Sequence, residues 1–295
     1  RRCARSRDSA MRRCSAADLP EPHGIPSRGM GSGRMPEARL PHDVMEFTGK
    51  SAALQRRMAE SRDLAQRRLA ILHELAPRRG ERMLEIGCGA GLLLREIGLA
   101  TGPHGLAAGI DISPDQTAAA EAECDGVPGV QERTGDVLAL DWPDAVFDGA
   151  VAAHVIEYLD APEQALAAIR RVLKPGARFV CLAVNWDSEF WYGPDPALTA
   201  PVVAAWRAGL PRPNLPAQLG PMLARTGFGA LRQVPVPVVN ASLSEDQLAP
   251  WMARLMAATA GPAAGPAWLK ALEAADAAGE MFHSSVPILT SATAI

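Results

Sequence analysis

The sequence has no long apolar run, few aromatic residues and no excess of basic charge. No stretch of its 295 residues approaches the ~18 consecutive apolar residues of a membrane-spanning helix, so it contains no transmembrane candidate and predicts no stable membrane insertion. The net charge is -3 at pH 7, with a pI near 6.1, whereas general nucleic-acid binders usually carry a basic domain. The composition therefore argues against a nucleic-acid partner.

Cysteine is also scarce. The five cysteines are scattered, form no CxxC pair and have no histidine cluster beside them at zinc spacing, so we expect no metal site. Free thiols are typical of a reducing compartment, which predicts a cytoplasmic protein. With 48% hydrophobic residues, a chain of this length can bury a core without disulfide or metal support.

Residues 1–44 differ in composition from the rest of the chain. Arginine, proline, glycine and serine recur there without apolar periodicity. Such a segment buries too little apolar surface to offset its ordering entropy, so we expect it to be disordered. The alternatives are an Arg-rich transit peptide, a basic arm, or an over-extended gene model, which we favour because the chain begins without Met and later methionines offer starts. Residues 45–295 are expected to form the folded domain.

Strand-like and helix-like runs alternate between residues 82 and 185. An amphipathic helix that ends before Pro77 precedes them. The predicted strands are 82–86, 106–110, 130–133, 147–153 and 178–184, and the predicted helices between them are 92–99, 114–124 and 162–173. This series predicts a parallel, doubly wound sheet with helices on both faces. Ligands of such sheets bind beyond the carboxyl ends of the strands.

Residues 186–280 are predicted to form a cap and acceptor region with late strands. We expect inserted helices there, with a linker at 261–266. The predicted sixth strand, 231–239, contains two prolines, which cannot donate to a ladder, so it should lie at an edge or be broken. The last strand is expected within 279–289.

A glycine-rich turn joins the first strand to the helix that follows. It reads GCGAG over residues 87–91, and glycines allow the backbone to approach a ligand closely. A dinucleotide fingerprint requires glycine at position 92, which is Leu92, and no Gly-Lys-Ser/Thr of a phosphate-binding loop is present. A tight turn of purely structural importance would also explain the glycines. The spacing argues against a nicotinamide-dependent dehydrogenase.

Two aspartates end the next two predicted strands. Asp111 lies 20 residues after Gly91, the separation typical of an acid that binds ribose hydroxyls. Asp136 ends the third strand, where a carboxylate can accept a hydrogen bond from an adenine amine. The structural alternatives are a helix-capping role for Asp111 and a turn role for Asp136. The ordered combination of glycine loop and two acids favours a binding role.

Four runs carry a family resemblance: LEIGCGAG, GIDISPDQ, GDVLALDWPDAVFDGAV and AAIRRVLKPGARFV. Residues 82–185, which contain them, resemble the cofactor-binding core of class I S-adenosylmethionine-dependent methyltransferases, in the subgroup of the quinone-biosynthesis and small-molecule enzymes. The resemblance implies an α/β, Rossmann-like doubly wound sheet of seven strands whose last strand is antiparallel. The N-terminal helix and the C-terminal helical cap insertion predicted from the residues complete this fold class. The resemblance also implies S-adenosyl-L-methionine as the cofactor.

The same resemblance implies roles for individual residues. The glycine loop would line the methionine part of the cofactor, with Cys88 as a small packing residue. Glu85, where the family usually has Asp, would orient the cofactor's amino group; Asp111 would bind the ribose and Asp136 would border the adenine. The predicted cofactor-binding residues are Glu85, Gly87, Cys88, Gly89, Gly91, Asp111, Ile112, Asp136, Val137 and His154.

His154 and Asp187 are the candidate catalytic residues. His154 follows the fourth strand, where the chain passes the methyl group in this fold, and Asp187 follows the fifth. A packing or capping role for His154, which we favour, and a loop role for Asp187 are the alternatives. Near Asp187 lie four aromatic residues that would suit an apolar or aromatic acceptor, or would form ordinary lid packing; they are Trp186, Phe190, Trp191 and Tyr192.

The predicted function is methyl transfer to a small-molecule acceptor, driven mainly by positioning of the reactants. The alternative is a catalytically inactive module that keeps the fold and the cofactor pocket for binding or regulation. The predicted assembly is a monomer or a homodimer.

Overall fold

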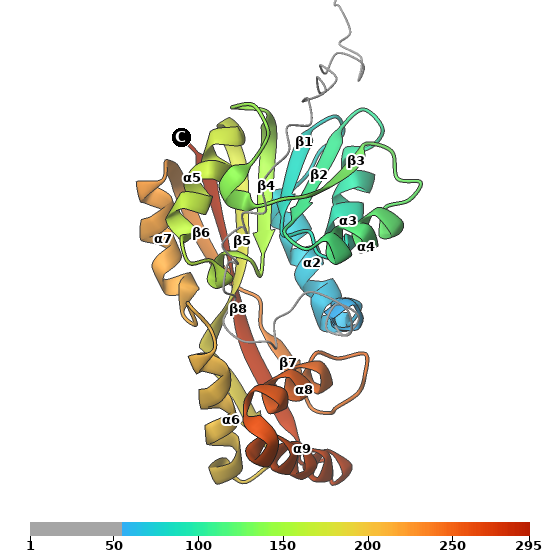
Figure 1. The fold of residues 1–295 in the computed structure, drawn as a ribbon, viewed down its shortest axis with the longest axis vertical. Helices are drawn as coiled ribbons and strands as arrows, with labels where there is room; N and C mark the ends of the chain where they lie inside the picture. Colours follow the sequence, from blue (N-terminus) through green and yellow to red (C-terminus); the bar gives the residue numbers. More distant parts are fainter. Residues whose placement is uncertain (1–54) are drawn as a thin grey trace, which may run out of the picture. The chain divides into compact units, whose positions relative to one another are not determined.

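The computed structural model describes residues 55–295, and their central feature is a mixed sheet flanked by helices (Figure 1). The strands are β1 (Arg82–Ile86), β2 (Leu106–Asp111), β3 (Val130–Thr134), β4 (Phe147–Ala153), β5 (Leu173–Tyr192), β6 (Phe228–Pro235), β7 (Val238–Asn240) and β8 (Phe282–Ala294). The α-helices are α2 (Arg62–Leu75), α3 (Leu92–Thr101), α4 (Pro114–Glu123), α5 (Pro162–Val172), α6 (Pro196–Ala208), α7 (Leu215–Arg225), α8 (Ala249–Thr259) and α9 (Gly261–Ala277). Two 3₁₀ turns are η3 (Val137–Ala139) and η4 (Ile156–Tyr158). The predicted disorder of residues 1–44 falls outside the described residues.

The sheet has the strand order β3-β2-β1-β4-β5-β8-β6, and β7 pairs with β8. Strands β1 to β5 are parallel, whereas β8 runs antiparallel to β5 and β6. The Rossmann-like sheet with an antiparallel last strand is therefore confirmed. The predicted count of seven strands was wrong, because the sheet has eight. The predicted sixth strand divides into β6 and β7 around Pro237, which has no N–H to donate to a ladder.

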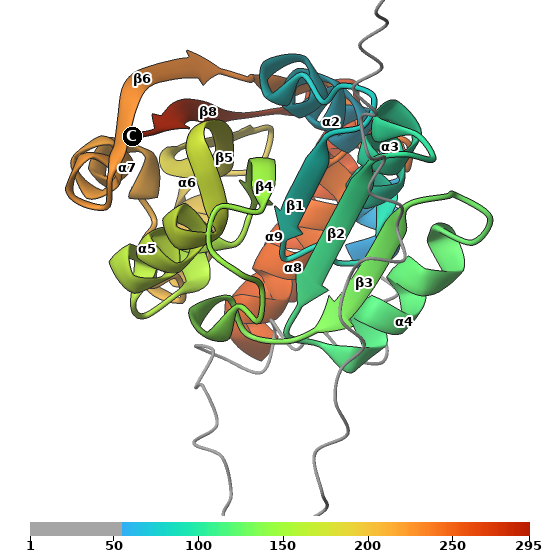
Figure 2. The same cartoon turned by 90° about the horizontal axis from the view of Figure 1, so that it is seen from above.

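Helices cover both faces of the parallel strands (Figure 2). Leu166 of α5 and Leu219 of α7 belong to the same core cluster as Leu84, on one face. On the other face, Ile71 of α2 packs in the same cluster as Met83. Burying each such side chain stabilises the fold by roughly 1.5–3 kcal/mol. Because side chains alternate along β1, Met83 faces α2 and α3 while Leu84 faces the opposite side.

Helix α2 also carries charged residues into the interior. Its N-cap is Ser61, whose hydroxyl oxygen accepts a hydrogen bond from the Leu64 N–H at 3.4 Å. Asp63 and Arg67 are buried on the same face as Ile71, because residues four apart share one side of a helix. The buried face of α2 therefore presents both apolar and charged side chains to the sheet.

The ends of β5 and β8 extend beyond the parallel strands and support a second apolar core, beside α6, α8 and α9 (Figure 1). Helices α8 and α9 lie between β7 and β8 in the chain, as the predicted cap insertion requires. The core of this cap combines aliphatic side chains with buried tryptophans and methionines, among them Trp191, Trp206, Met252, Met256 and Trp268.

The linker predicted at 261–266 was wrong, because these residues form the first turns of α9. Proline is compatible with the first turn of a helix, where the N–H has no partner in any case, and α9 has such a proline. Gly265 allows α9 to approach α8, since a Cβ there would lie 2.0 Å from the Ala257 carbonyl oxygen. None of the helices in the described part has the length and apolar character that a membrane span requires.

Candidate active site

The loop between β1 and α3 turns sharply on three glycines. Gly87, Gly89 and Gly91 have φ angles of 67°, 50° and 83°, a region that favours glycine. At Gly87 a Cβ would also lie 2.3 Å from Val155 Cγ2. At Gly89 the nearest described side-chain atom to such a Cβ is Gln116 Oε1, at 3.9 Å. The backbone of the loop is therefore packed on one side and open at Gly89.

Asp111 connects this loop to the start of α4. Its Oδ2 accepts a hydrogen bond from the Gly89 N–H and its Oδ1 accepts one from the Ser113 N–H, both at 2.9 Å. Burial raises the pKa of Asp111 above its ordinary value, and the two N–H groups oppose that shift. The N-cap of α4 is Ser113 and not Asp111, because the Ser113 Oγ accepts a hydrogen bond from the Gln116 N–H. A carboxylate has about four acceptor sites, so Asp111 can also accept bonds from a ligand.

Glu85 lies on β1 with an unpaired oxygen. The residue is 4% exposed, and its Oε2 is buried without a hydrogen-bond partner among residues 55–295. Burial raises the pKa of Glu85 well above its ordinary value, and the charges of Asp111 and Glu96 add to this shift. Burying an unpaired charge costs several kcal/mol. A ligand ammonium beside Glu85 would remove that cost.

Three other predicted cofactor residues have structural roles in the fold. Cys88 is 5% exposed, and burial raises the pKa of its thiol, which fits a packing residue. Asp136 is the N-cap of η3 and accepts from the Leu138 N–H at 2.9 Å, so the turn alternative accounts for this carboxylate. Val137 is buried in the core, whereas Ile112 is exposed. The adenine-side role of Asp136 stays a prediction.

His154 follows β4 and faces two charged side chains. Its Nδ1 lies 3.3 Å from Glu157 Oε1, and its Nε2 lies 3.4 Å from Arg67 Nη1. The φ angle of His154 is 57°, which is uncommon for a residue with a Cβ and costs of order 1–3 kcal/mol. The next residue, Val155, packs against Gly87. The chain directly after His154 therefore lies against the glycine loop.

Arg67 and Glu157 were not among the residues predicted from sequence. They are 6% and 1% exposed, and charged residues are almost never so buried unless they are paired. The available signal was the position of Arg67 on the apolar face of α2, four residues before Ile71. The residues that Arg67 contacts depend on how α2 is positioned along β4. The helical periodicity of the sequence does not show this position.

Asp187 lies far along β5 and forms an ion pair with Arg207 of α6. Its side chain is 45% exposed, so the pair accounts for this residue without a role in catalysis, and the catalytic role stays a prediction. The four aromatic residues nearby do not form one wall. Trp186 and Trp191 are buried, whereas Phe190 and Tyr192 are exposed. Alternation along the strand accounts for residues 190–192, and the register of β5 against β8 shifts between Asn185 and Phe190.

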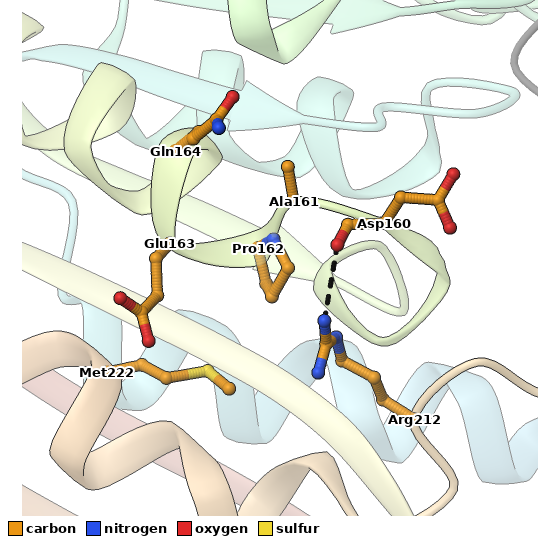
Figure 3. A pocket seen from close by; sticks show the side chains of 7 residues that line it. All are labelled: Asp160, Ala161, Pro162, Glu163, Gln164, Arg212 and Met222. Carbon is orange, nitrogen blue, oxygen red and sulfur yellow. Dashed lines mark hydrogen bonds between the residues drawn. The ribbon is translucent and has the colours of Figure 1, made fainter.

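A separate hollow of about 310 Å³ opens at the start of α5 (Figure 3). It is lined by Asp160, Ala161, Pro162, Glu163, Gln164, Arg212 and Met222. Arg212 Nη2 donates to the Asp160 carbonyl oxygen at 3.2 Å. The hollow contains none of the predicted cofactor residues.

The fold and the glycine loop together define a class. The sheet order, the antiparallel β8, the positive-φ loop after β1 and the acid at the end of β2 are those of the class I S-adenosylmethionine-dependent methyltransferase fold. Residues 84–181 match the sequence model of a family described as a methyltransferase domain. The match covers about a third of the chain, over the strands and loops that form the predicted cofactor-binding core, and it confirms the resemblance stated from the motifs.

Relatives and solved structures agree with this result. The chain is 37% identical over 89 residues to an uncharacterised 37.1 kDa protein in transposon TN4556 of Streptomyces fradiae, covering 30% of this chain and 26% of that one. It is 38% identical over 81 residues to the ubiquinone/menaquinone biosynthesis C-methyltransferase UbiE of Caulobacter sp., covering 28% and 32%. The chain thus spans about a third or less of the curated relatives it matches. Haemonchus contortus phosphoethanolamine N-methyltransferase 2, at 17% identity, covers 85% of this chain and 58% of its own with a TM-score of 0.56, which shows the fold.

Proposed function

We propose that this protein transfers the methyl group of S-adenosyl-L-methionine to a small-molecule acceptor. The observation that carries the proposal is the Gly89–Asp111 hydrogen bond, which fixes an open glycine backbone beside a buried acid. When bound, this cofactor supplies an electrophilic methyl group on a sulfonium sulfur. A solved structure of similar fold, the Haemonchus contortus enzyme, was determined with S-adenosylhomocysteine, which supports the choice of cofactor.

The residues present fit such a cofactor. The unpaired Glu85 Oε2 is available to its ammonium group, and the open side of Gly89 leaves room for its chain. Asp111 would accept hydrogen bonds from the ribose hydroxyls, and Asp136 with Val137 would border the adenine. Residues 82–185 would thus hold the cofactor, and Cys88 would pack beneath it.

The acceptor would bind between His154 and the cap that contains α6, α8 and α9, within the predicted acceptor region 186–280. His154 would serve as a general base where the acceptor has a proton to lose, which contributes typically 10²–10⁴-fold. The proposed acceptor has an apolar or aromatic body, as the aromatic residues of the segment 186–192 suggest. The names of two similar proteins, a quinone-biosynthesis C-methyltransferase and a phosphoethanolamine N-methyltransferase, are consistent with small acceptors. A monomer or a homodimer, in the cytoplasm, is the proposed form.

Calorimetric titration of the full chain with S-adenosylhomocysteine, with NADH as the control ligand, tests the cofactor. We expect binding of S-adenosylhomocysteine only. Asp111→Ala should weaken this binding by about 1.5–3 kcal/mol, the range for hydrogen bonds to a charged group. Unchanged affinity in this variant would remove Asp111 from the site. Binding without turnover of any compound in an acceptor panel would favour the inactive module.

A further inference from the structure

We infer that the acceptor group is a hydroxyl that ionises, phenolic or enolic, and that Arg67 binds its oxygen as His154 Nε2 takes its proton. This inference rests on the proposed function and adds to it the class of acceptor and a buried cation that binds it.

The guanidinium of Arg67 has an N–H donor without a hydrogen-bond partner in the described part of the chain. Arg67 is 6% exposed, and within residues 55–295 its Nε is buried without a hydrogen-bond partner. The hydrogen bond of its Nη1 is the long one to His154 Nε2, at 3.4 Å. Guanidinium carries five N–H donors, and an unsatisfied buried donor costs about 1–3 kcal/mol. A ligand oxygen beside His154 would satisfy these donors.

Acidic groups from three elements keep this cation charged. Burial lowers the pKa of Arg67 to about 10, while Glu189 of β5, Asp63 of α2 and Glu157 of η4 raise it. Tyr158, also on η4, acts in the same direction. Arg67 is therefore a cation at neutral pH, in a place where water screens its charge poorly.

The two neighbours of His154 determine its tautomer. Arginine has no acceptor atom, so His154 Nε2 must accept from Arg67, and the ring proton lies on Nδ1, which donates to Glu157 Oε1. The basic lone pair of His154 is thus directed toward Arg67. The side chain of His154 is 28% exposed and that of Glu157 is 1% exposed, so a ligand can reach the ring while the carboxylate stays covered.

The chemistry of this pair selects a hydroxyl. A hydroxyl proton replaces Arg67 at Nε2; its O–H bond breaks, the proton passes to Nε2, and the electron pair stays on the oxygen beside the guanidinium. Glu157, whose Oε2 is buried and unpaired within the described part of the chain, stabilises the imidazolium that forms. An amine acceptor loses this advantage, because it enters as a cation next to Arg67 and leaves no anion for Arg67 to bind.

The probe for this inference is 4-nitrophenol, whose phenolate is coloured. Mixed with the full chain and S-adenosylhomocysteine at mildly acidic pH, it should show a stronger phenolate band than in buffer. Arg67→Met should reduce the phenolate bound at least tenfold, and Arg67→Lys, which keeps the charge, should restore part of it. Arg62→Met is the matched control, since Arg62 lies on the same helix with a 53% exposed side chain, and it should leave the band unchanged.

Several outcomes separate the inference from the proposed function. Binding of S-adenosylhomocysteine without a phenolate band in the wild-type chain, or a full band in Arg67→Met, would overturn the role of Arg67 and leave the cofactor assignment intact. Failure of S-adenosylhomocysteine to bind, measured by calorimetry, would remove the proposed function itself. A ¹⁵N histidine NMR spectrum of the wild-type chain should show the ring proton of His154 on Nδ1, and an Nε2–H tautomer would contradict the inference even if the Arg67 variants do not fold.

Discussion

His283 Nε2 lies 2.9 Å from Glu189 Oε1, and both side chains are buried. Trp191 Nε1 donates to the same oxygen at 2.8 Å, and its ring lies against that of His283, with centroids 4.1 Å apart. On the other side, His283 Nδ1 is 3.4 Å from Asn240 Oδ1, and Asn240 Nδ2 donates to Asp63 Oδ2 at 2.9 Å. This chain of bonds connects β5, β8, β7 and α2, and so holds the cap to the helix that carries Arg67.

Glu189→Ala should lower the free energy of unfolding by about 1–3 kcal/mol for each buried donor that loses its acceptor. The groups left without their acceptor are His283 Nε2 and Trp191 Nε1. Urea denaturation followed by circular dichroism measures the loss. The matched control is Glu245→Ala, which breaks an exposed pair with Arg254 and should cost at most about 1 kcal/mol. Equal losses in the two variants would mean that the Glu189 network does not hold the cap.

Gly87→Ala should damage the glycine loop more than a change of backbone preference explains. Both Gly87 and Gly80 have a positive φ, but a Cβ at position 80 would meet nothing within 4 Å, whereas one at 87 would lie 2.3 Å from Val155 Cγ2. Gly80→Ala should therefore cost only the ~1–2 kcal/mol of a left-handed residue. Gly87→Ala should cost more and should also weaken S-adenosylhomocysteine binding, as thermal unfolding and calorimetry would show. The same small loss in both variants would place Val155 away from the loop.

The sequence predicted the parallel strands and the glycine loop well because both depend on local signals. A buried strand such as β2 is a continuous apolar run up to Ile110, and the positions of Gly87 and Asp111 follow from strand ends and spacing. The late strands were harder. β5 continues to Tyr192 and β8 is one strand of 13 residues, because each is stabilised by the other over its full length, and such pairing between distant segments has no local pattern.

The charged part of the candidate site could not be predicted for the same reason. Arg67, Glu157 and Glu189 come from three distant segments, and each alone has the appearance of an ordinary surface charge. They meet only after α2 packs against the sheet and β5 continues past Asn185. His154 was among the predicted residues because it follows a strand end, which local sequence patterns indicate, and its role stays a prediction.

Glu85→Gln should stabilise the ligand-free chain at neutral pH. The pKa of Glu85 is raised in the folded state by burial, and then by the charges of Asp111 and Glu96, so the folded chain binds the carboxyl proton more tightly than the unfolded chain does. The free energy of unfolding therefore falls as pH rises from the ordinary glutamate value through the raised one. The glutamine side chain of the variant does not titrate, so Glu85→Gln should match the wild type in acid and exceed it at pH 7.

Glu74→Gln serves as a control, because its effect on the free energy of unfolding at pH 7 should be opposite in sign to that of Glu85→Gln. A hydrogen bond from Ser291 and the nearby Arg232 lower the pKa of Glu74, so this carboxylate contributes stability that is present above the ordinary glutamate value and is lost in acid. Its replacement should destabilise the chain at pH 7. Urea denaturation at a series of pH values, with and without S-adenosylhomocysteine, measures both effects. The ligand's ammonium group should compensate the charge of Glu85. The ligand should therefore raise the free energy of unfolding at pH 7 more in the wild type than in Glu85→Gln. An equal increase in both would mean that the ammonium group does not lie beside Glu85.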